Sequence, residues 1–326
     1  MKLERYRVKE LGAFSADRMT GRQRILTPVD TITAENVADV LEAALGVHAA
    51  NAAEITYLWN YYRGRQDVRN KQKITRQNIN NKITVNRANE IVTFKTAYLL
   101  NEPVQFISNG GDDKVSEDVN RLNDYMRAED KESKDKELVD WLHICGIAER
   151  FTVNDEMSGE NDGAPFDTFV IDPRFAFVIY SAKISRKPMA GVIIQTDTDG
   201  TTYADVYTET ECFTVKGDTV TATPHILGGI PLVEYENNMA RMGSFECVLS
   251  ILNGINQLES NAVDSVEDFV NGFDVFQNCK ISDGDYAQLS LGGKAIAIKT
   301  VTQGMEAKVY RIASELNQTG VQTRTD

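Results

Sequence analysis

The sequence has few residues of the kinds that usually build catalytic or metal centres. Three histidines and four cysteines occur in 326 residues, and no two cysteines form a C-x-x-C pair. A zinc site or a disulfide framework is therefore not expected, and synthesis in a reducing cytosol fits. His48, His143 and His225 have no neighbours at metal-binding spacing, so we interpret all three as structural.

Long apolar runs and phosphate-binding loops are also missing. No stretch approaches the ~20 apolar residues of a membrane span, and the opening MKLERYRVKELG has no apolar signal region. The Gly-Lys pair of LGGK (291–294) lacks P-loop spacing, and DTDTDG (195–200) fits a hairpin better than a calcium loop. We therefore predict no cofactor, no metal site, no catalytic residue and no membrane partner. The protein is not expected to be an enzyme.

Charge is unevenly distributed along the chain. The 48 acidic residues exceed the 35 basic ones, giving a net charge of −13, which is unsuited to tight duplex binding through phosphate contacts. Segment 57–87 departs from this balance, because it is aromatic and then strongly basic. Its aromatic residues are Tyr57, Trp59, Tyr61 and Tyr62, and its cations are Arg63, Arg65, Arg69, Lys71, Lys73, Arg76, Lys82 and Arg87. It could bind nucleic acid by phosphate contact and stacking, serve as a solvated connector, or pack on an acidic neighbouring subunit.

The distribution of proline separates helical from extended regions. Five of the seven prolines lie between 165 and 231, where apolar residues alternate with period two, so this region is predicted to form an antiparallel sheet. Apolar residues elsewhere recur with helical period. Helices are predicted at 34–62, 85–100, about 115–128 and about 134–148. The expected fold class is α+β.

The strongest predicted element is a helix over 243–272. Its apolar stripe includes Leu252, Ile255, Leu258 and Val266, and no Lys or Arg occurs between Met242 and Asn278. Such a stripe must pack against something sizeable, either the core of one domain or other copies of the same helix. Beyond it, KAIAIK (294–299) and MEAKVYRI (305–312) predict a small hairpin, and a further helix is expected to start at 313.

An ordered series of short motifs resembles one protein family. The motifs are YYRGRQ (61–66), NNKI (80–83), KTAYLL (95–100), EPV (102–104), IDPR (171–174) and GIPLV (229–233), followed by Phe245-Glu246 and the long helix. Together they resemble portal proteins of tailed bacteriophages, specifically the siphophage type common in Gram-positive hosts. The resemblance covers about residues 55–275. Asn253-Gly254 and Asn256 depart from the family's usual Asp-Ala-Tyr-like run.

The resemblance implies a non-enzymatic ring, usually of twelve subunits, at one capsid vertex of the virion, made in the host cytoplasm. Double-stranded DNA would pass through it without tight binding. Other implied partners are the large terminase, the head-completion (adaptor) protein, the scaffold and the major capsid protein. The implied parts are an N-terminal helical extension (1–54), a wing of helices and antiparallel sheet (55–241), a stem helix (242–274), a small α/β clip (275–313) and the start of the returning stem helix (314–326). The crown and tunnel loop would lie beyond Asp326.

Three groups of site residues follow as hypotheses. Carboxylates on the stem helix would face the channel and repel the phosphates of passing DNA; these are Glu259, Asp264, Glu267 and Asp268. Cations of the basic segment would contact the acidic region 112–140 of a neighbouring subunit; these are Arg63, Arg65, Arg69 and Lys73. In the clip, Asp283, Asp285 and Lys294 would face the terminase.

Two other functions stay open on the sequence alone. The first is a nucleic-acid-binding module that uses segment 57–87 without forming a ring. The second is a metal-dependent nuclease, although no carboxylate spacing singles out a two-metal site.

Overall fold

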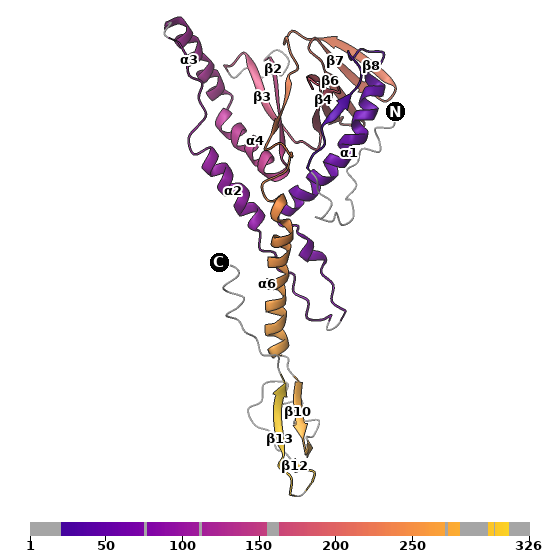
Figure 1. The fold of residues 1–326 in the computed structure, drawn as a ribbon, viewed down its shortest axis with the longest axis vertical. Coiled ribbons are helices and arrows are strands. Elements are labelled where there is room, and N and C mark those ends of the chain that lie inside the picture. Colours follow the sequence, from indigo (N-terminus) through magenta and orange to yellow (C-terminus); the bar gives the residue numbers. More distant parts are fainter. Residues whose placement is uncertain are drawn as a thin grey trace. The chain divides into compact units, whose positions relative to one another are not determined.

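The computed structural model describes residues 21–312, apart from 75–76, 111–112, 155–162, 271–272, 281–298 and 303 (Figure 1). The fold is α+β, as predicted. The chain divides into two compact units. Unit 1 contains the described residues of 1–67 and 86–252, and unit 2 those of 68–85 and 253–326. Within the described ranges, no helix is both long and apolar enough to cross a membrane.

Unit 1 contains a six-stranded sheet with the order β1-β4-β5-β6-β7-β8. The strands are β1 (Ile25–Thr27), β4 (Ala176–Ser181), β5 (Pro188–Thr196), β6 (Thr202–Tyr207), β7 (Glu211–Lys216) and β8 (Thr219–Pro224). The antiparallel pairing predicted for the proline-rich region holds from β4 to β8. Gly200 and Gly217 have φ of +83° and +63° at two of the hairpin turns, a conformation that glycine adopts readily. The short strand β1, which the sequence did not reveal, pairs parallel with β4.

A second sheet covers one face of the first. It has the order β3-β2-β9, with β2 at Ile147–Asn154, β3 at Phe166–Ile171 and β9 at Leu232–Glu236. The period-two pattern of β4 explains how the two sheets meet: Ala176 and Val178 join Leu232 in a core between the sheets, while Phe177 and Ile179 point to the opposite face.

Helix α1 (Val37–Tyr62) covers that opposite face. Val37, Val40 and Leu41 pack on the sheet, and the helix runs without a break through Gly46, where a side chain would meet open space. The expected boundary between residues 54 and 55 therefore falls inside one continuous helix. The predicted start at 34 lies three residues too early, because Asn36 is the residue at the helix N-cap.

The second half of α1 enters a separate core together with other helices of unit 1. These are α2 (Arg87–Leu99), α4 (Lys131–Cys145) and the first turn of α6 (Leu249–Val270), while α3 (Asp113–Ala128) packs on α4. Aromatic rings fill this core: Trp59 stacks on Trp141 with centroids 4.8 Å apart, and Tyr61 stacks on Phe245 at 5.9 Å. The predicted helices at 85–100, 115–128 and 134–148 are confirmed to within about three residues at each end.

The long helix is shorter than predicted. Residues Glu246–Val248 form a 3₁₀ turn, and α6 covers 22 residues instead of the expected thirty. The residues that precede α6 are closely packed and do not join the helix. A Cβ on Gly243 would lie 2.2 Å from the carbonyl oxygen of Ile144, and Phe245 is fully buried. These contacts hold residues 243–245 in a non-helical path.

Unit 2 ends in two small antiparallel pairs of strands. Strand β10 (Phe273–Gln277) pairs with β13 (Lys308–Ile312), and β11 (Cys279–Lys280) pairs with β12 (Lys299–Thr300). The prediction that 305–312 pairs with 294–299 is therefore wrong: its partner is a strand that the sequence pattern had placed partly in the long helix. Asp283, Asp285 and Lys294, together with the helix expected from 313, lie outside the described residues.

Candidate functional site

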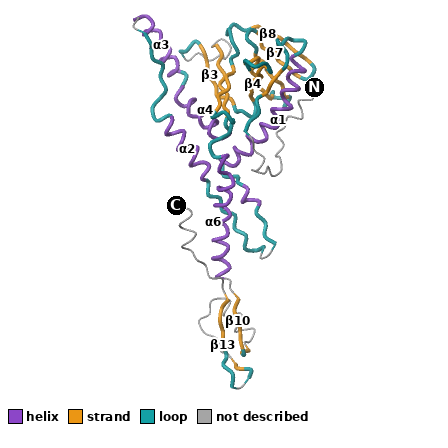
Figure 2. Tube along the Cα trace, in the orientation of Figure 1, coloured by secondary structure: helices purple, strands orange, loops and turns teal. Residues whose placement is uncertain are grey.

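Three polar side chains at four-residue intervals on α6 bind an extended segment of unit 2. The Oδ1 atom of Asn256 accepts the backbone N–H of Val85 at 2.8 Å, and Ser260 Oγ accepts that of Ile83 at 3.0 Å. Asp264 Oδ1 accepts the N–H of Asn81 at 2.6 Å. Figure 2 shows the segment as a loop without regular secondary structure beside the helix. We name this arrangement the polar ladder (Asn256, Ser260, Asp264 with residues 81–85).

The spacing of the ladder follows from backbone geometry. Four residues of α-helix rise about 6 Å, and two residues of an extended chain about 6.6 Å, so every fourth side chain of the helix meets every second N–H of the segment. The segment runs opposite to the helix, since its residue numbers fall as those of the helix rise. All three ladder side chains are buried, so the segment satisfies the polar face of α6 inside the chain.

Two lysines bind Asp264, the last residue of the polar ladder. Lys73 Nζ lies 2.6 Å and Lys71 Nζ 2.9 Å from Asp264 Oδ2. Burial by itself would raise the pKa of Asp264, but hydrogen bonds from Lys73, the Asn81 amide and Lys71 together hold that pKa well below its ordinary value. With only 2% of its surface exposed, Asp264 is not an open carboxylate on a channel wall, which corrects that prediction. Lys73, predicted at a subunit interface, is bound within its own chain.

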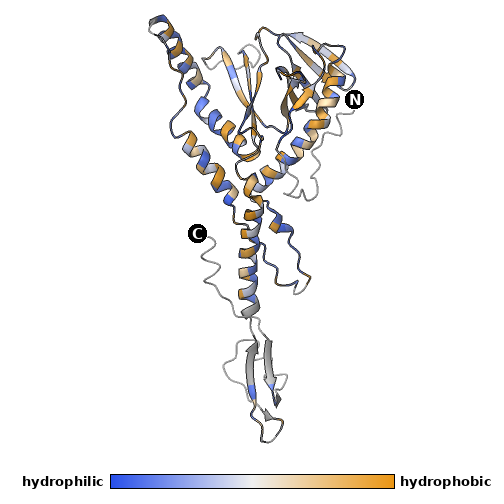
Figure 3. Ribbon diagram, in the orientation of Figure 1, coloured by the Kyte–Doolittle hydropathy of each residue, from blue (hydrophilic) through white to orange (hydrophobic). Residues whose placement is uncertain are grey.

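The opposite face of α6 is apolar, and in the part of the chain that the structure describes it is exposed. Ile251, Leu258 and Val266 are 61%, 40% and 45% exposed, and Ile255 and Ala262 beside them are half-buried. At about 100° per residue these five positions lie across the helix from the polar ladder. Figure 3 shows the hydrophobic positions recurring along α6. The helix thus buries its polar side and exposes its apolar stripe (251, 255, 258, 262 and 266), the reverse of an ordinary surface helix.

The remaining stem-helix carboxylates are Glu259, Glu267 and Asp268. Glu259 and Glu267 are half-buried and lie about 80° apart around the helix. The side chain of Asp268 lies outside the description. The channel assignment therefore stays a prediction for Glu259, Glu267 and Asp268.

The predicted interface arginines are exposed and belong to different units. Arg63 and Arg65 lie in unit 1, with the Arg63 guanidinium 5.7 Å from the Trp59 ring centroid, and Arg69 lies in unit 2. In the acidic region 112–140, five of the eleven carboxylates form ion pairs with cations of the same region. They join Asp118 to Arg121, Asp124 to Arg127, Glu129 to Lys134, Asp135 to Lys131, and Glu132 to Lys136. Charge pairing between the two regions of neighbouring subunits stays a prediction.

The aromatic residues of segment 57–87 serve the core of unit 1. Tyr61 is fully buried, Trp59 stacks on Trp141, and the Tyr57 hydroxyl donates to Asp67 Oδ2 at 2.9 Å. These rings are therefore not arranged as a platform on which exposed bases could stack.

Each histidine has a structural partner. His48 is 3.0 Å from the carbonyl oxygen of Arg174, and burial lowers its pKa to about 4; His225 is 3.0 Å from the carbonyl oxygen of Thr208. His143 Nδ1 lies 2.9 Å from Ser244 Oγ, but its buried Nε2 has no partner in the described part of the chain, so this pair lacks the third group that orients a catalytic base. No group of three or more metal-ligating side chains occurs among the described residues.

A second buried polar network joins the two strands β2 and β9. Glu149 and Glu234 stand directly opposite each other across the pair, and Arg241 binds Glu234 through Nη1 at 2.7 Å and Nη2 at 2.9 Å. Burial and the carboxylate of Glu234 raise the pKa of Glu149 well above its ordinary value, because two ionised carboxylates in contact repel each other. A protonated Glu149 can instead donate a hydrogen bond to Glu234.

This network predicts that stability falls as the pH rises. Above about pH 4.5 the unfolded chain releases the Glu149 proton while the folded chain keeps it, so the free energy of unfolding should decline by up to about 1.4 kcal/mol per pH unit until the raised pKa is passed. Glu149→Gln should remove this part of the decline. Urea unfolding of both proteins at several pH values from 5 to 8 measures the difference, and parallel stability profiles would contradict it.

An uncovered apolar helix face is typical of chains that work by assembling with other chains. The sequence agrees with that class: residues 43–326 match the family described as phage portal protein, SPP1 Gp6-like. Because the match covers most of the sequence, the chain belongs to this family of structural proteins. No individual curated protein matches it.

The polar ladder was not recognised from the sequence, although its pattern is present. Asn256, Ser260 and Asp264 recur at i, i+4 and i+8 on the side of the helix away from the apolar stripe. Short polar side chains at such spacing indicate a face that binds backbone, whereas a solvated face would carry longer charged side chains.

Proposed function

We propose that this chain is the subunit of a homo-oligomeric ring at one vertex of a phage capsid, through which double-stranded DNA is packaged and ejected. Family membership supports a portal role in the virion. The number of subunits expected from the family is twelve, and the siphophage type of Gram-positive hosts remains a prediction. In this proposal the subunits are made in the host cytoplasm and assemble there.

The observation that carries the proposal is the reversed polarity of α6. A helix that satisfies its polar face internally and leaves an apolar stripe outside gains stability by covering that stripe. Copies of the same chain related by rotation would bring neighbouring helices alongside one another, as ring closure through a heterologous interface requires. The residues assigned in this way are Ile251, Leu258 and Val266.

In such a ring, the surface of the α6 helices that lines the channel would be acidic. The α6 helix contains no Lys or Arg, and the two lysines that contact it through Asp264, Lys71 and Lys73, are ion-paired with that residue. Each contact between a free lysine or arginine and a DNA phosphate would add salt-dependent affinity and slow sliding. The absence of such residues from α6 therefore favours transit of DNA. We propose that the side of α6 with Glu259 and Glu267 faces the channel.

The other assignments follow the family. Unit 1 would be the main part of the wing, α6 the stem helix, and the strands β10 to β13 part of the clip that meets the large terminase through Asp283, Asp285 and Lys294. The adaptor protein, the scaffold and the major capsid protein are the remaining proposed partners.

Native mass spectrometry of the full-length protein tests the proposal with two neighbouring substitutions on α6. Leu258→Asp places a charge in the exposed apolar stripe and should abolish or strongly reduce the ring. Gln257→Asp adds the same charge one residue away, on a different side of the helix, and should leave assembly intact. Full assembly of the Leu258→Asp variant, or failure of the unmodified protein to form any annular particle, would overturn the proposal.

The nucleic-acid-binding module receives no specific support, because the aromatic residues it would need are packed in the core. Sub-micromolar, strongly salt-dependent binding of DNA by the free subunit would revive it.

A further inference from the structure

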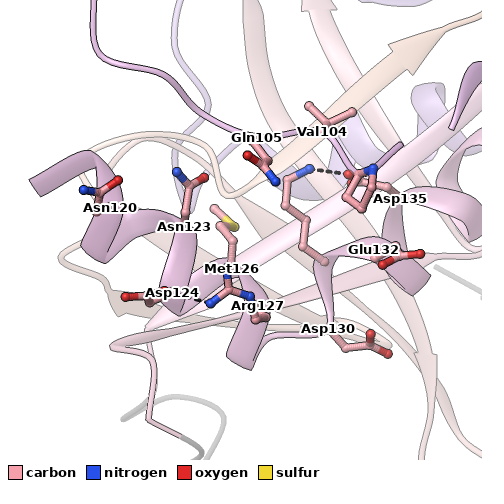
Figure 4. Close-up of a pocket in the computed structure, with 12 residues that line it drawn as sticks. Val104, Gln105, Asn120, Asn123, Asp124, Met126, Arg127, Asp130, Glu132 and Asp135 are labelled. Atoms are coloured by element: carbon pink, nitrogen blue, oxygen red, sulfur yellow. Dashed lines mark hydrogen bonds and ion pairs between the residues drawn. The ribbon is translucent and has the colours of Figure 1, made fainter. Parts of the chain in front are cut away.

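A groove on unit 1 lies between an extended segment and two helices. Its volume is about 600 Å³, and its walls are residues 103–105, α3 and α4. Figure 4 shows Val104 and Gln105 on one side, with Asn123 and Met126 of α3 on the other. Asn123 fixes the segment, since its side-chain amide both accepts the N–H of Phe106 at 3.0 Å and donates to the carbonyl oxygen of Phe106 at 2.9 Å. The groove is therefore a built feature of the fold.

The segment beside this groove is unusually apolar for a solvated strand. Val104, Phe106 and Ile107 are all exposed, and Ile107 is 87% so. Four carboxylates line the groove, and three of them form ion pairs within the chain: Asp124 with Arg127, Glu132 with Lys136, and Asp135 with Lys131. The fourth, Asp130, is exposed and forms no ion pair within the described residues. An apolar ridge beside this carboxylate suits a partner that combines an aliphatic side chain with positive charge.

The same chain presents a segment of that composition. The loop 182–187 between β4 and β5 has the sequence AKISRK, with three cations and no acid, and all of it is exposed. Ile184 at its turn is fully exposed, which is an unfavourable position for an aliphatic side chain unless something covers it. Lys183 makes one ion pair, at 2.5 Å to Asp30, whereas Lys187 makes none within the described residues.

The two features lie at different sides of unit 1. The loop is held to the segment that leads from β1 to α1, because Ala182 N–H donates to the carbonyl oxygen of Thr27 at 2.8 Å and Lys183 pairs with Asp30. Figure 1 shows the beginning of α1 beside β7 and β8, and α3 at the opposite edge of the same unit. A chain therefore cannot easily fill its own groove with its own loop. Two complementary patches on opposite edges are what a closed ring of identical subunits requires.

We infer that loop 182–187 of one subunit docks on the groove between residues 103–107, α3 and α4 of the next subunit. Ile184 covers the ridge of Val104 and Phe106, and Lys187 approaches Asp130. This inference rests on the proposed ring and adds a contact between wings that is separate from the stripe on α6.

Cross-linking in the assembled full-length protein tests the contact directly. In a Cys247→Ser background, which removes an exposed native thiol, the pair Val104→Cys and Ile184→Cys is treated with a short bismaleimide. We expect a ladder of covalent multimers on denaturing gels from the double variant and only monomers from each single variant. Rings of normal mass that give no ladder would overturn the inference while leaving the proposed function standing.

Charge exchange provides a second test that does not depend on cysteines. Lys187→Glu and Asp130→Lys should each raise the protein concentration needed for half-assembly by about fivefold, and combining them should restore most of the loss. Lys216→Glu, an exposed lysine elsewhere in unit 1, serves as the control and should have no effect. Single variants that assemble like the unmodified protein, or a double variant without recovery, would overturn the docking.

Discussion

Replacing Asp264 with alanine is expected to lower the free energy of unfolding of unit 2 by about 3 kcal/mol. The substitution leaves the mostly buried ammonium of Lys71 without its counter-ion and the Asn81 amide without its acceptor. Removing one partner of a buried ion pair typically costs about 3–5 kcal/mol, because the charge that remains is uncompensated. Denaturant unfolding measures the loss, and hydrogen exchange should show faster exchange of the Asn81 and Ile83 amides.

Asp118→Ala is a suitable control for this experiment. Asp118 lies on an exposed helix face and meets Arg121 at 3.9 Å, so its removal should change stability by less than about 0.5 kcal/mol. If Asp264→Ala were as mild as Asp118→Ala, the ladder would not hold the segment to α6.

The second large effect is expected from Arg241→Ala. Its guanidinium binds Glu234 and Glu236, and its Nε donates to the carbonyl oxygen of Arg22 at 2.8 Å. In the variant, the carboxyl groups of Glu149 on β2 and of Glu234 and Glu236 on β9 lack the positive charge of Arg241. We expect a loss of about 3–5 kcal/mol at neutral pH, measured by denaturant unfolding.

The loss from Arg241→Ala should shrink as the pH falls, because a protonated Glu149 carries no charge for Arg241 to offset. Adding Glu149→Gln to this variant should recover part of the stability at neutral pH. A loss that is independent of pH would show that Arg241 acts by packing alone.

Much of the fold could be predicted because it rests on periodicity. The period-two runs that became β4 to β7 and the helical patterns of α1, α2 and α4 specify which side of each element is buried. Family membership could likewise be predicted, because the order of short motifs such as YYRGRQ and IDPR is visible without a structure.

The errors have physical causes that a one-dimensional pattern does not contain. The apolar pattern of the long helix continues back to 243, yet residues 243–245 are not helical, and Ser244 N–H donates to the carbonyl oxygen of His143 at 2.7 Å. The strand 305–312 was paired with its sequence neighbour, whereas its real partner is β10, more than thirty residues away. The burial of Asp264 could not be predicted, because the two lysines that bind it lie about 190 residues earlier in the sequence.

That separation has a consequence for how the chain is made. Residues 71–85 leave the ribosome about 180 residues before the helix that orders them, which at 5–20 residues per second is a delay of roughly 10–35 s. During this interval three backbone amides and two lysines have only water and ions as partners. A nascent chain interrupted before residue 264 therefore lacks the last residue of the polar ladder. Ordering of residues 71–85 must wait until synthesis has passed that aspartate.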